Sequence, residues 1–200
     1  GLLFQKKIEF KKSISFPCSY LAGKTERRLY VNLNKNENNK LLISEVTKNG
    51  FRRSHEHMYI PVCERCNACI PSRINTKDFK FSKNNLRVVK LNSDLSFKKN
   101  FDNYSQRHYV LFKNYCFERH ESSQMIDMNI KEFNNFFFES KNKNQIFDLV
   151  DSSDNLLGSI LVDILNDGYS AVYSFFDPHK SKRSLGKLLI LKLIDELKII

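Results

Sequence analysis

The chain has 200 residues, and 33 Lys and Arg against 22 Asp and Glu give it a formal net charge of +11. No apolar run approaches the ~20 residues of a membrane-spanning helix, and no secretory signal is visible, so we expect a cytoplasmic protein without a membrane partner. The 41% of hydrophobic residues is enough for a packed core. The excess positive charge favours an anionic partner such as nucleic acid, although it also serves general solubility.

The first two thirds of the chain alternate short periodic runs with polar loops, including a solvated tract at residues 34–40. Apolar periodicity and capping residues assign the elements. In chain order we predict an edge strand or arm at residues 1–16, a strand at 27–33, a helix at 41–48 that ends near Gly50, a helix at 81–91 capped by Ser82, a helix at 104–120 with Tyr109, Phe112, Cys116 and Phe117 on one face, and a short helix at 131–138.

The last third predicts an antiparallel meander followed by a helix. Strand-like runs at residues 145–151, 156–166 and 169–176 are separated by turn residues, and leucines then recur at helical spacing from Leu185. Strands joined by short turns and followed by a helix indicate an α+β fold. Asn, Asp and Ser cluster between residues 95 and 105, which predicts a weak boundary there. The chain ends at Ile200 inside an apolar helical pattern, so we expect a further C-terminal segment.

Three cysteines, Cys63, Cys66 and Cys69, stand at two successive Cys-x-x-Cys spacings. A tight loop with this spacing can direct several thiolates at one metal centre. A fourth ligand is then needed, and Cys18 is the best candidate. Both a 4Fe–4S iron–sulfur cluster and an all-thiolate zinc site are compatible with this set, and so are reduced thiols that only pack. Cys116 fits the core face of a helix.

Several pieces along the chain form one recognisable pattern: residues 17–23 with Glu26 and Arg27, 50–54, 59–73, 79 with 86–89, 109–120, and 165–178 followed by 183–186. Together these pieces resemble one family, the aminoacyl-tRNA–protein transferases, which comprises eukaryotic arginyltransferases and bacterial leucyltransferases of the Bpt type. Leu21 stands where the eukaryotic branch tends to carry a second cysteine, so the resemblance favours the bacterial branch and leucine as the donor.

The resemblance implies a division of the chain and a function. Residues 1–100 would form an N-terminal transferase domain with the cysteine loop, and residues 101–200 a domain like the GNAT acyltransferases. The implied donor is leucyl-tRNA or, as the alternative, arginyl-tRNA. The implied acceptors are proteins with an N-terminal Asp or Glu, which the transfer marks for degradation. No cofactor is required for this chemistry, because the aminoacyl ester is already activated.

An enzyme can accelerate this transfer largely by positioning the acceptor α-amine against the ester. A hydrogen-bond donor to the oxyanion and a proton acceptor add to the acceleration. We look for these groups on the strand at 169–176 and just after it. Asp177 is a candidate to take the ammonium proton, Tyr173 to stabilise the oxyanion or protonate the leaving ribose oxygen, and Ser170 to assist. Ordinary strand packing and turn chemistry also explain each of them.

An acidic acceptor requires a cation, and the planar fork of arginine suits a carboxylate. Arg73, directly after the cysteine loop, is the first choice. Arg183 precedes the last predicted helix, where a helix N-terminus attracts phosphate. The other candidates for substrate binding are Arg52, Arg53, Arg87 and Arg119.

Two other classes of protein remain open from the sequence. A non-catalytic RNA-binding protein or iron–sulfur sensor would use the basic surface and the cysteine loop. An acetyltransferase that uses coenzyme A would fit the meander and helix, but the loop before that helix is poor in glycine, with Gly186 alone.

Overall fold

The computed structural model describes residues 9–18, 20–33, 39–54, 56–69, 72–119, 127–138 and 143–198, without the side chains of residues 136 and 138. The first half of the predicted N-terminal arm, most of the polar tract at 34–40 and the last residue of the helix predicted at 104–120 lie outside them. Within these ranges no helix is both long and apolar enough to cross a membrane. The chain divides into two compact units, Gly1–Ser72 and Arg73–Ile200.

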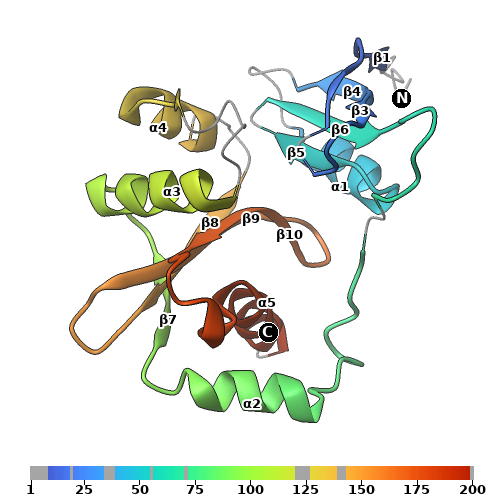
Figure 1. Cartoon of the computed structure of the whole chain (residues 1–200). Coiled ribbons are helices and arrows are strands. Elements are labelled where there is room, and N and C mark those ends of the chain that lie inside the picture. The colour runs from blue at the N-terminus through green and yellow to red at the C-terminus, as the bar shows by residue number, and fades with distance from the viewer. Residues whose placement is uncertain are drawn as a thin grey trace. The chain divides into compact units, whose positions relative to one another are not determined.

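The N-terminal unit is built on an antiparallel sheet in the order β1-β4-β6-β5 (Figure 1). The helix α1 ends where Gly50, at φ 89°, reverses the chain in a conformation that favours glycine. The predicted strand at 27–33 and the predicted helix at 41–48 are both confirmed. The elements are β1 (Lys11–Lys12), β2 (Phe16–Pro17), β3 (Thr25–Glu26), β4 (Arg28–Asn32), α1 (Lys40–Lys48), β5 (Arg52–Ser54) and β6 (His57–Pro61), and β2 and β3 pair as a separate hairpin.

The C-terminal unit contains the predicted meander as part of a second antiparallel sheet, in the order β10-β9-β8-β7. Helices α3 and α4 lie on one side of this sheet, and α5 and α2 on the other (Figure 1). The α+β class is therefore confirmed. The elements are α2 (Lys83–Leu91), β7 (Ser96–Asn100), α3 (Gln106–Arg119), α4 (Ile130–Phe138), β8 (Asn144–Val150), β9 (Leu156–Ile164), β10 (Tyr169–Phe176), a 3₁₀ turn (Ser181–Arg183) and α5 (Leu185–Lys198).

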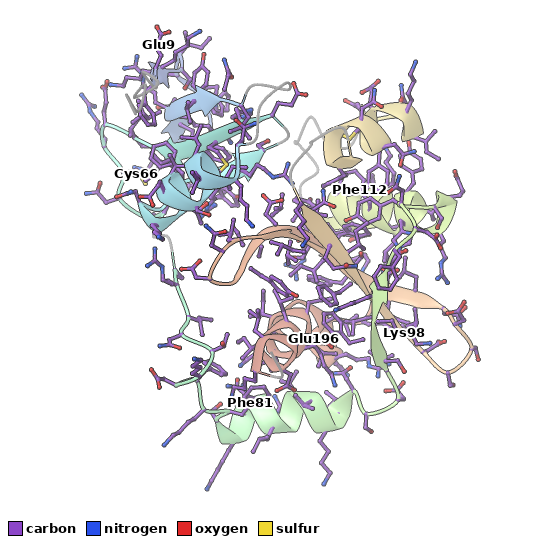
Figure 2. All side chains as sticks on the ribbon, turned by 180° about the vertical axis from the view of Figure 1, so that it is seen from behind. Glu9, Cys66, Phe81, Lys98, Phe112 and Glu196 are labelled. Atoms are coloured by element: carbon purple, nitrogen blue, oxygen red, sulfur yellow. The ribbon has the colours of Figure 1, made fainter. Side chains whose placement is uncertain are left out.

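Aromatic rings fill the layer between α3, α4 and the sheet. Phe112 of α3 is fully buried, and its ring centroid lies 4.9 Å from that of Phe133 and 5.8 Å from that of Phe175. Figure 2 shows Phe112 among the side chains packed around it. On the other side of the sheet the leucines of α5 supply the core, and Leu188 and Leu189 are fully buried. These apolar layers hold β10 from both sides.

Local capping explains where helix α2 begins. The Ser82 hydroxyl accepts a hydrogen bond from the Asn85 N–H at 3.1 Å, as expected for the N-cap of α2.

In α3, Phe112 and Cys116 are buried as predicted, but Phe117 is 60% exposed, so its predicted place on the buried face is wrong. The reason is geometric, since one residue after Cys116 a side chain is rotated by about 100° around the helix.

The residues at the predicted boundary take part in the second sheet. Ser96–Asn100 form β7, which pairs with β8 over its whole length. This strand was not predicted from the sequence. The compact units divide instead between Ser72 and Arg73. The division by function into residues 1–100 and 101–200 stays a prediction.

Candidate active site

Strand β10 carries an irregularity that changes which side chains share a face. Its pairing with β9 shifts by one residue between Ala171 and Tyr173, so Val172 is an extra residue of the kind found in β-bulges. Ser170 pairs with Asp163, and Tyr173 pairs with Leu161. Partners two apart on β9 point to the same face. The bulge therefore brings Ser170 and Tyr173 to one face, although residues three apart on a regular strand lie on opposite faces.

Tyr173 lies half-buried against the aromatic layer. Its ring centroid is 5.9 Å from Phe112 and 5.6 Å from Phe137, and its hydroxyl is 3.9 Å from the Cys116 sulfur. Burial raises the pKa of the Cys116 thiol, and the hydrogen bond with Tyr173 only partly opposes this. The thiol therefore stays protonated, and Cys116 is a packing residue, as predicted.

Asp177 continues the ladder past the end of β10. Its N–H donates to the Leu157 carbonyl at 2.8 Å, and its carboxylate accepts the His179 N–H at 3.0 Å in an Asx turn. At about 3.3 Å per residue, Asp177 lies roughly 13 Å along the chain from Tyr173. A single reacting atom therefore cannot lie within hydrogen-bond reach of Ser170, Tyr173 and Asp177 together.

Two buried carboxylates of the second sheet, Asp148 and Asp163, were not predicted as site residues. Asp163, 2% exposed, lies across from Ser170 on the same face. Asp148 is 6% exposed and accepts the Ser159 hydroxyl at 2.8 Å. The signal for both was an aspartate inside an otherwise apolar strand, which a protein keeps only if the charge has partners.

His108 of α3 completes the network around Asp148. Its Nε2 lies 3.0 Å from both carboxylate oxygens, and its Nδ1 accepts the backbone N–H of Ser105 at 3.1 Å. An Nδ1 that accepts a hydrogen bond leaves the proton on Nε2, which donates to Asp148. The first turn of α3 is thereby fastened to the centre of the sheet.

The start of α5 is basic, but its arginine is already engaged. Arg183 Nε donates to Asn92 Oδ1 at 2.8 Å, its Nη2 donates to Asp94, and its carbonyl accepts from Asn92 Nδ2 at 2.9 Å. The predicted phosphate contact would compete with these bonds. The exposed cations beside the helix start are Lys180, Lys182 and Lys187.

Gly186 has a packing role on the first turn of α5. A Cβ at this position would lie 2.8 Å from Cε1 of Phe176, closer than side chains tolerate. Arg119, the last residue of α3, covers the same ring, with its guanidinium carbon 4.7 Å from the Phe176 centroid. The predicted candidate Arg119 is thus an exposed cation placed at the end of β10.

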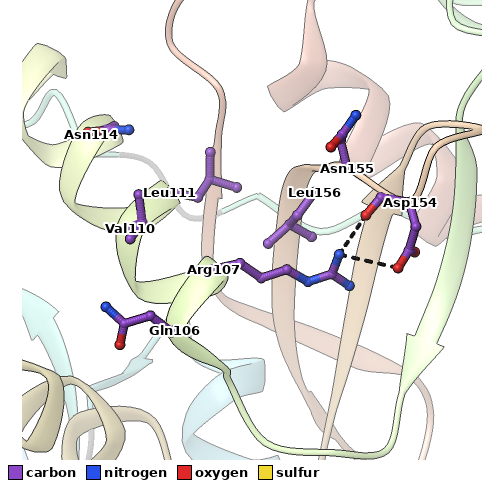
Figure 3. A pocket seen from close by; sticks show the side chains of 8 residues that line it. All are labelled: Gln106, Arg107, Val110, Leu111, Asn114, Asp154, Asn155 and Leu156. Carbon is purple, nitrogen blue, oxygen red and sulfur yellow. Dashed lines mark hydrogen bonds and ion pairs between the residues drawn. The ribbon is translucent and has the colours of Figure 1, made fainter.

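A shallow pocket opens between the start of α3 and the turn after β8 (Figure 3). Arg107 reaches across it, and its Nη1 donates to the Asp154 carbonyl at 2.6 Å and lies 3.5 Å from the Asp154 carboxylate. None of the predicted site residues lines this pocket. It is lined by Gln106, Arg107, Val110, Leu111, Asn114, Asp154, Asn155 and Leu156.

The remaining predicted arginines lie in different environments. Arg52 is exposed on β5, whereas its neighbour Arg53 is only 5% exposed and faces the interior of the N-terminal unit. Arg73 is exposed at the start of the C-terminal unit, and Arg87 bonds Asn84 within α2. Of these four, Arg52, Arg73 and Arg87 are exposed, and Arg53 is buried.

The four cysteines of the predicted metal site lie on loops of the N-terminal unit, Cys18 after β2 and the other three after β6. The Cys18 sulfur accepts the backbone N–H groups of Tyr20 and Leu21 at 3.5 and 3.4 Å. The loop thiols are partly exposed in Cys63 and Cys66, the latter labelled in Figure 2, and exposed in Cys69. Over the described ranges no three His, Cys, Asp or Glu side chains gather as a metal site. The cluster or zinc site stays a prediction.

Comparison with known proteins places these elements in a family. The family model for the N terminus of arginine-tRNA-protein transferases matches residues 16–87, and the model for their C terminus matches residues 107–199. The first match includes the cysteine loop, and the second includes α3, the meander and α5.

Curated bacterial proteins match nearly the whole chain. The aspartate/glutamate leucyltransferase of Granulibacter bethesdensis is 35% identical over 185 residues, which is 91% of this chain and 68% of that protein. The protein of the same name from Paramagnetospirillum magneticum is 35% identical over 94% of this chain and 77% of its own length. That of Marinobacter nauticus is 36% identical over 90% and 76%. The resemblance seen in the sequence is confirmed: the chain belongs to the aminoacyl-tRNA–protein transferase family, and the protein is an aminoacyltransferase.

Proposed function

We propose that this protein transfers leucine from leucyl-tRNA to the N-terminal α-amine of proteins that begin with Asp or Glu, and so marks them for degradation. The observation that carries the proposal is the identity of 33–36% over most of the chain with proteins named aspartate/glutamate leucyltransferase. Charged tRNA and new proteins meet in the cytoplasm, and we propose that the enzyme acts there.

The reaction needs no covalent enzyme intermediate. The neutral α-amine attacks the ester carbonyl, the C–N bond of the new peptide forms, the ester C–O bond breaks, and the terminal ribose keeps the oxygen. The amine gives up a proton, and the ribose oxygen gains one. An α-amine with an ordinary pKa near 7.7–8.0 is partly neutral at pH 7. The enzyme therefore contributes mainly alignment and charge stabilisation.

We propose a GNAT-like arrangement for the C-terminal unit, with the donor at the carboxyl end of β10. The bulge in β10, the helix α5 that follows it and the lysines around that helix start support this choice. A helix N-terminus and its basic neighbours suit a phosphate of the tRNA. Arg119, an exposed cation stacked on Phe176, would serve either this phosphate or the acceptor carboxylate.

Ser170 and Tyr173 remain the proposed catalytic groups, with Asp163 added as a positioning residue behind Ser170. The Ser170–Asp163 pair offers a proton acceptor chain, and the Tyr173 hydroxyl offers a donor for the oxyanion. Asp177, whose carboxylate closes a turn, is proposed to shape the loop before α5.

For the cysteines we propose that Cys18 and the loop thiols hold an iron–sulfur cluster or zinc. The backbone N–H groups directed at the Cys18 sulfur support a ligand role. Cys18, Cys63, Cys66 and Cys69 would hold the cluster or zinc, which would cross-link and orient the loop. Metal analysis of purified protein, repeated for Cys66→Ala, tests this, because loss of bound metal in the variant is expected.

The transfer is tested with purified protein, tRNA charged with labelled leucine or labelled arginine, and peptides that begin with Asp or with Ala. We expect label to move from leucyl-tRNA and not from arginyl-tRNA, and to the Asp peptide and not to the Ala peptide. Movement from arginyl-tRNA would change the donor, and no movement from either would overturn the proposal.

A further inference from the structure

The sheet of the N-terminal unit has two unlike faces. Val31, Met58 and Arg53 are direct cross-strand neighbours on β4, β6 and β5, and they are 4%, 1% and 5% exposed. They form the buried face. Because successive side chains of a strand alternate, their sequence neighbours on each strand point to the opposite face.

On this opposite face one row of side chains crosses all four strands. Lys11 pairs with Tyr30, Tyr30 pairs with Tyr59, and Tyr59 pairs with Arg52. Lys11 and Arg52 are exposed, and the two tyrosines are half-exposed. His57 lies beside both rings, 6.1 Å from the Tyr30 centroid and 5.8 Å from that of Tyr59. The row thus has an aromatic centre and a cation at each end.

Arg28 adds a fixed guanidinium plane to this face. Its guanidinium carbon lies 4.1 Å from the Tyr59 ring centroid, and its Nε donates to Glu26 Oε1 at 2.5 Å. Burial raises the pKa of Tyr59, so the phenol beside it is neutral and can donate a hydrogen bond. The guanidinium is therefore ordered before any ligand arrives, which lowers the entropy cost of binding to it.

The charge of the N-terminal unit agrees with an anionic ligand. Residues 1–72 carry 13 Lys and Arg against 6 Asp and Glu, whereas residues 73–200 carry 20 against 16. The smaller unit thus holds a net charge of +7 of the total +11. An aromatic patch alone would suit an apolar protein partner, but an aromatic centre flanked by cations is the pattern that binds bases and phosphates together.

We propose that the aromatic–basic face, formed by Lys11, Arg28, Tyr30, Arg52, His57 and Tyr59, binds an unpaired segment of RNA. Bases stack on Tyr30 and His57, and Lys11 and Arg52 hold the flanking phosphates. Only the source of the segment rests on the proposed function, since the unpaired nucleotides of the donor tRNA before its terminal ribose, which we place at β10, are then the natural occupant.

The test measures RNA binding by fluorescence anisotropy with the full chain and with RNA that carries no amino acid. The probes are a hairpin with a four-nucleotide 3′ overhang, the same hairpin with a blunt end, and the free single strand. Tyr30→Leu, which keeps apolar bulk but removes the ring, and Arg52→Ala are compared with two exposed controls, Phe101→Ala and Lys48→Ala. Thermal melts establish that each variant is folded.

We expect Tyr30→Leu to weaken overhang binding about five- to tenfold, the size of one lost base stack, and to leave the blunt hairpin unaffected. Arg52→Ala should reduce the slope of log K against log salt by about 0.7, one single-strand phosphate contact. The controls should bind as the unaltered protein does. Tighter binding of the overhang than of the free strand would identify a tRNA-like end.

Overhang binding that neither Tyr30→Leu nor Arg52→Ala weakens would overturn the inference, as would equal weakening for the blunt hairpin. The RNA carries no amino acid and no transfer is measured, so failure of the leucine transfer assay would leave this result standing. Failure of the RNA-binding test would likewise leave the transfer result standing.

Discussion

Asp148 and Ser159 face each other across β8 and β9, and both residues are buried, at 6% and 0% exposed. At the scale of single residues this network decides how α3 is fixed. A buried carboxylate is tolerated because Ser159 and His108 both donate to it, and removal of either leaves the carboxylate with one donor fewer.

We therefore expect His108→Ala to lower the free energy of unfolding by about 1.5–3 kcal/mol, the contribution of a hydrogen bond to a charged group. The neighbouring variant Arg107→Ala removes an exposed contact with Asp154 and should cost at most about 1 kcal/mol. Urea unfolding of both variants measures the difference. Equal losses would mean that the buried pair adds nothing beyond a surface ion pair.

Replacing each of two glycines of the C-terminal unit by alanine should affect stability very differently. Gly186→Ala places a Cβ 2.8 Å from the Phe176 ring, and we expect a loss of about 1–3 kcal/mol from overpacking. Gly168→Ala meets open space and should be nearly neutral. Thermal unfolding compares them, and Phe176→Leu combined with Gly186→Ala should recover part of the loss. No recovery would place the strain elsewhere.

At the scale of elements, Arg183 joins two segments that are far apart in sequence. It ties the end of α2 to the turn before α5 through Asn92, which is 1% exposed, and through Asp94. A planar guanidinium with several donors can hold both partners at once.

Arg183→Ala should destabilise the protein by about 1–3 kcal/mol, because the buried Asn92 oxygen loses its donor. Lys182→Ala, one residue earlier and exposed, should leave stability unchanged. If Arg183 served only to bind tRNA, its variant would raise the KM for leucyl-tRNA at unchanged stability. Denaturant unfolding and transfer kinetics on both variants separate the two roles.

The predicted meander, α5 and the other helices were readable because their apolar residues repeat at strand or helix spacing between turn residues. Strand β7 was not, since Phe97 is the single apolar residue in Ser96–Asn100. Strand β7 forms because it pairs with β8 and because the Phe97 ring stacks on that of Phe147, with centroids 4.9 Å apart. Pairing of this kind depends on a partner 50 residues away and leaves no local pattern.

The candidate site divides in the same way. Ser170, Tyr173 and Asp177 could be placed on or beside β10 from sequence, because a strand ends at the proline after Asp177. Their common face could not, since it follows from the bulge at Val172. Asp163 and His108 were missed because their partners come from other elements.

At the scale of the whole molecule, each compact unit has a core of its own. The large buried cluster, from Val88 to Leu193, lies entirely within the C-terminal unit. Phe79 and Phe81 pack against it, and Lys198 donates to the Phe79 carbonyl at 2.6 Å. The segment before α2 is therefore part of this unit.

A fragment of residues 73–200 should fold alone, whereas a fragment of residues 83–200, which lacks both phenylalanines, should melt at a lower temperature. Burial of a Phe side chain is worth about 1.5–3 kcal/mol, so the difference is measurable by circular dichroism. A 73–200 fragment without a cooperative transition would show that its core depends on the N-terminal unit.

The extra residue in β10 has a consequence for how this strand can change length. Deletion of Val172 would make the strand regular, and Ser170 would then stand two positions before Tyr173, so both would keep their partners on β9 and their common face. Ser170 would still lie across from Asp163. A single-codon deletion at this half-exposed valine would thus preserve the pairing of the site, whereas the same deletion in a regular part of the strand would exchange the faces of the residues on one side of it.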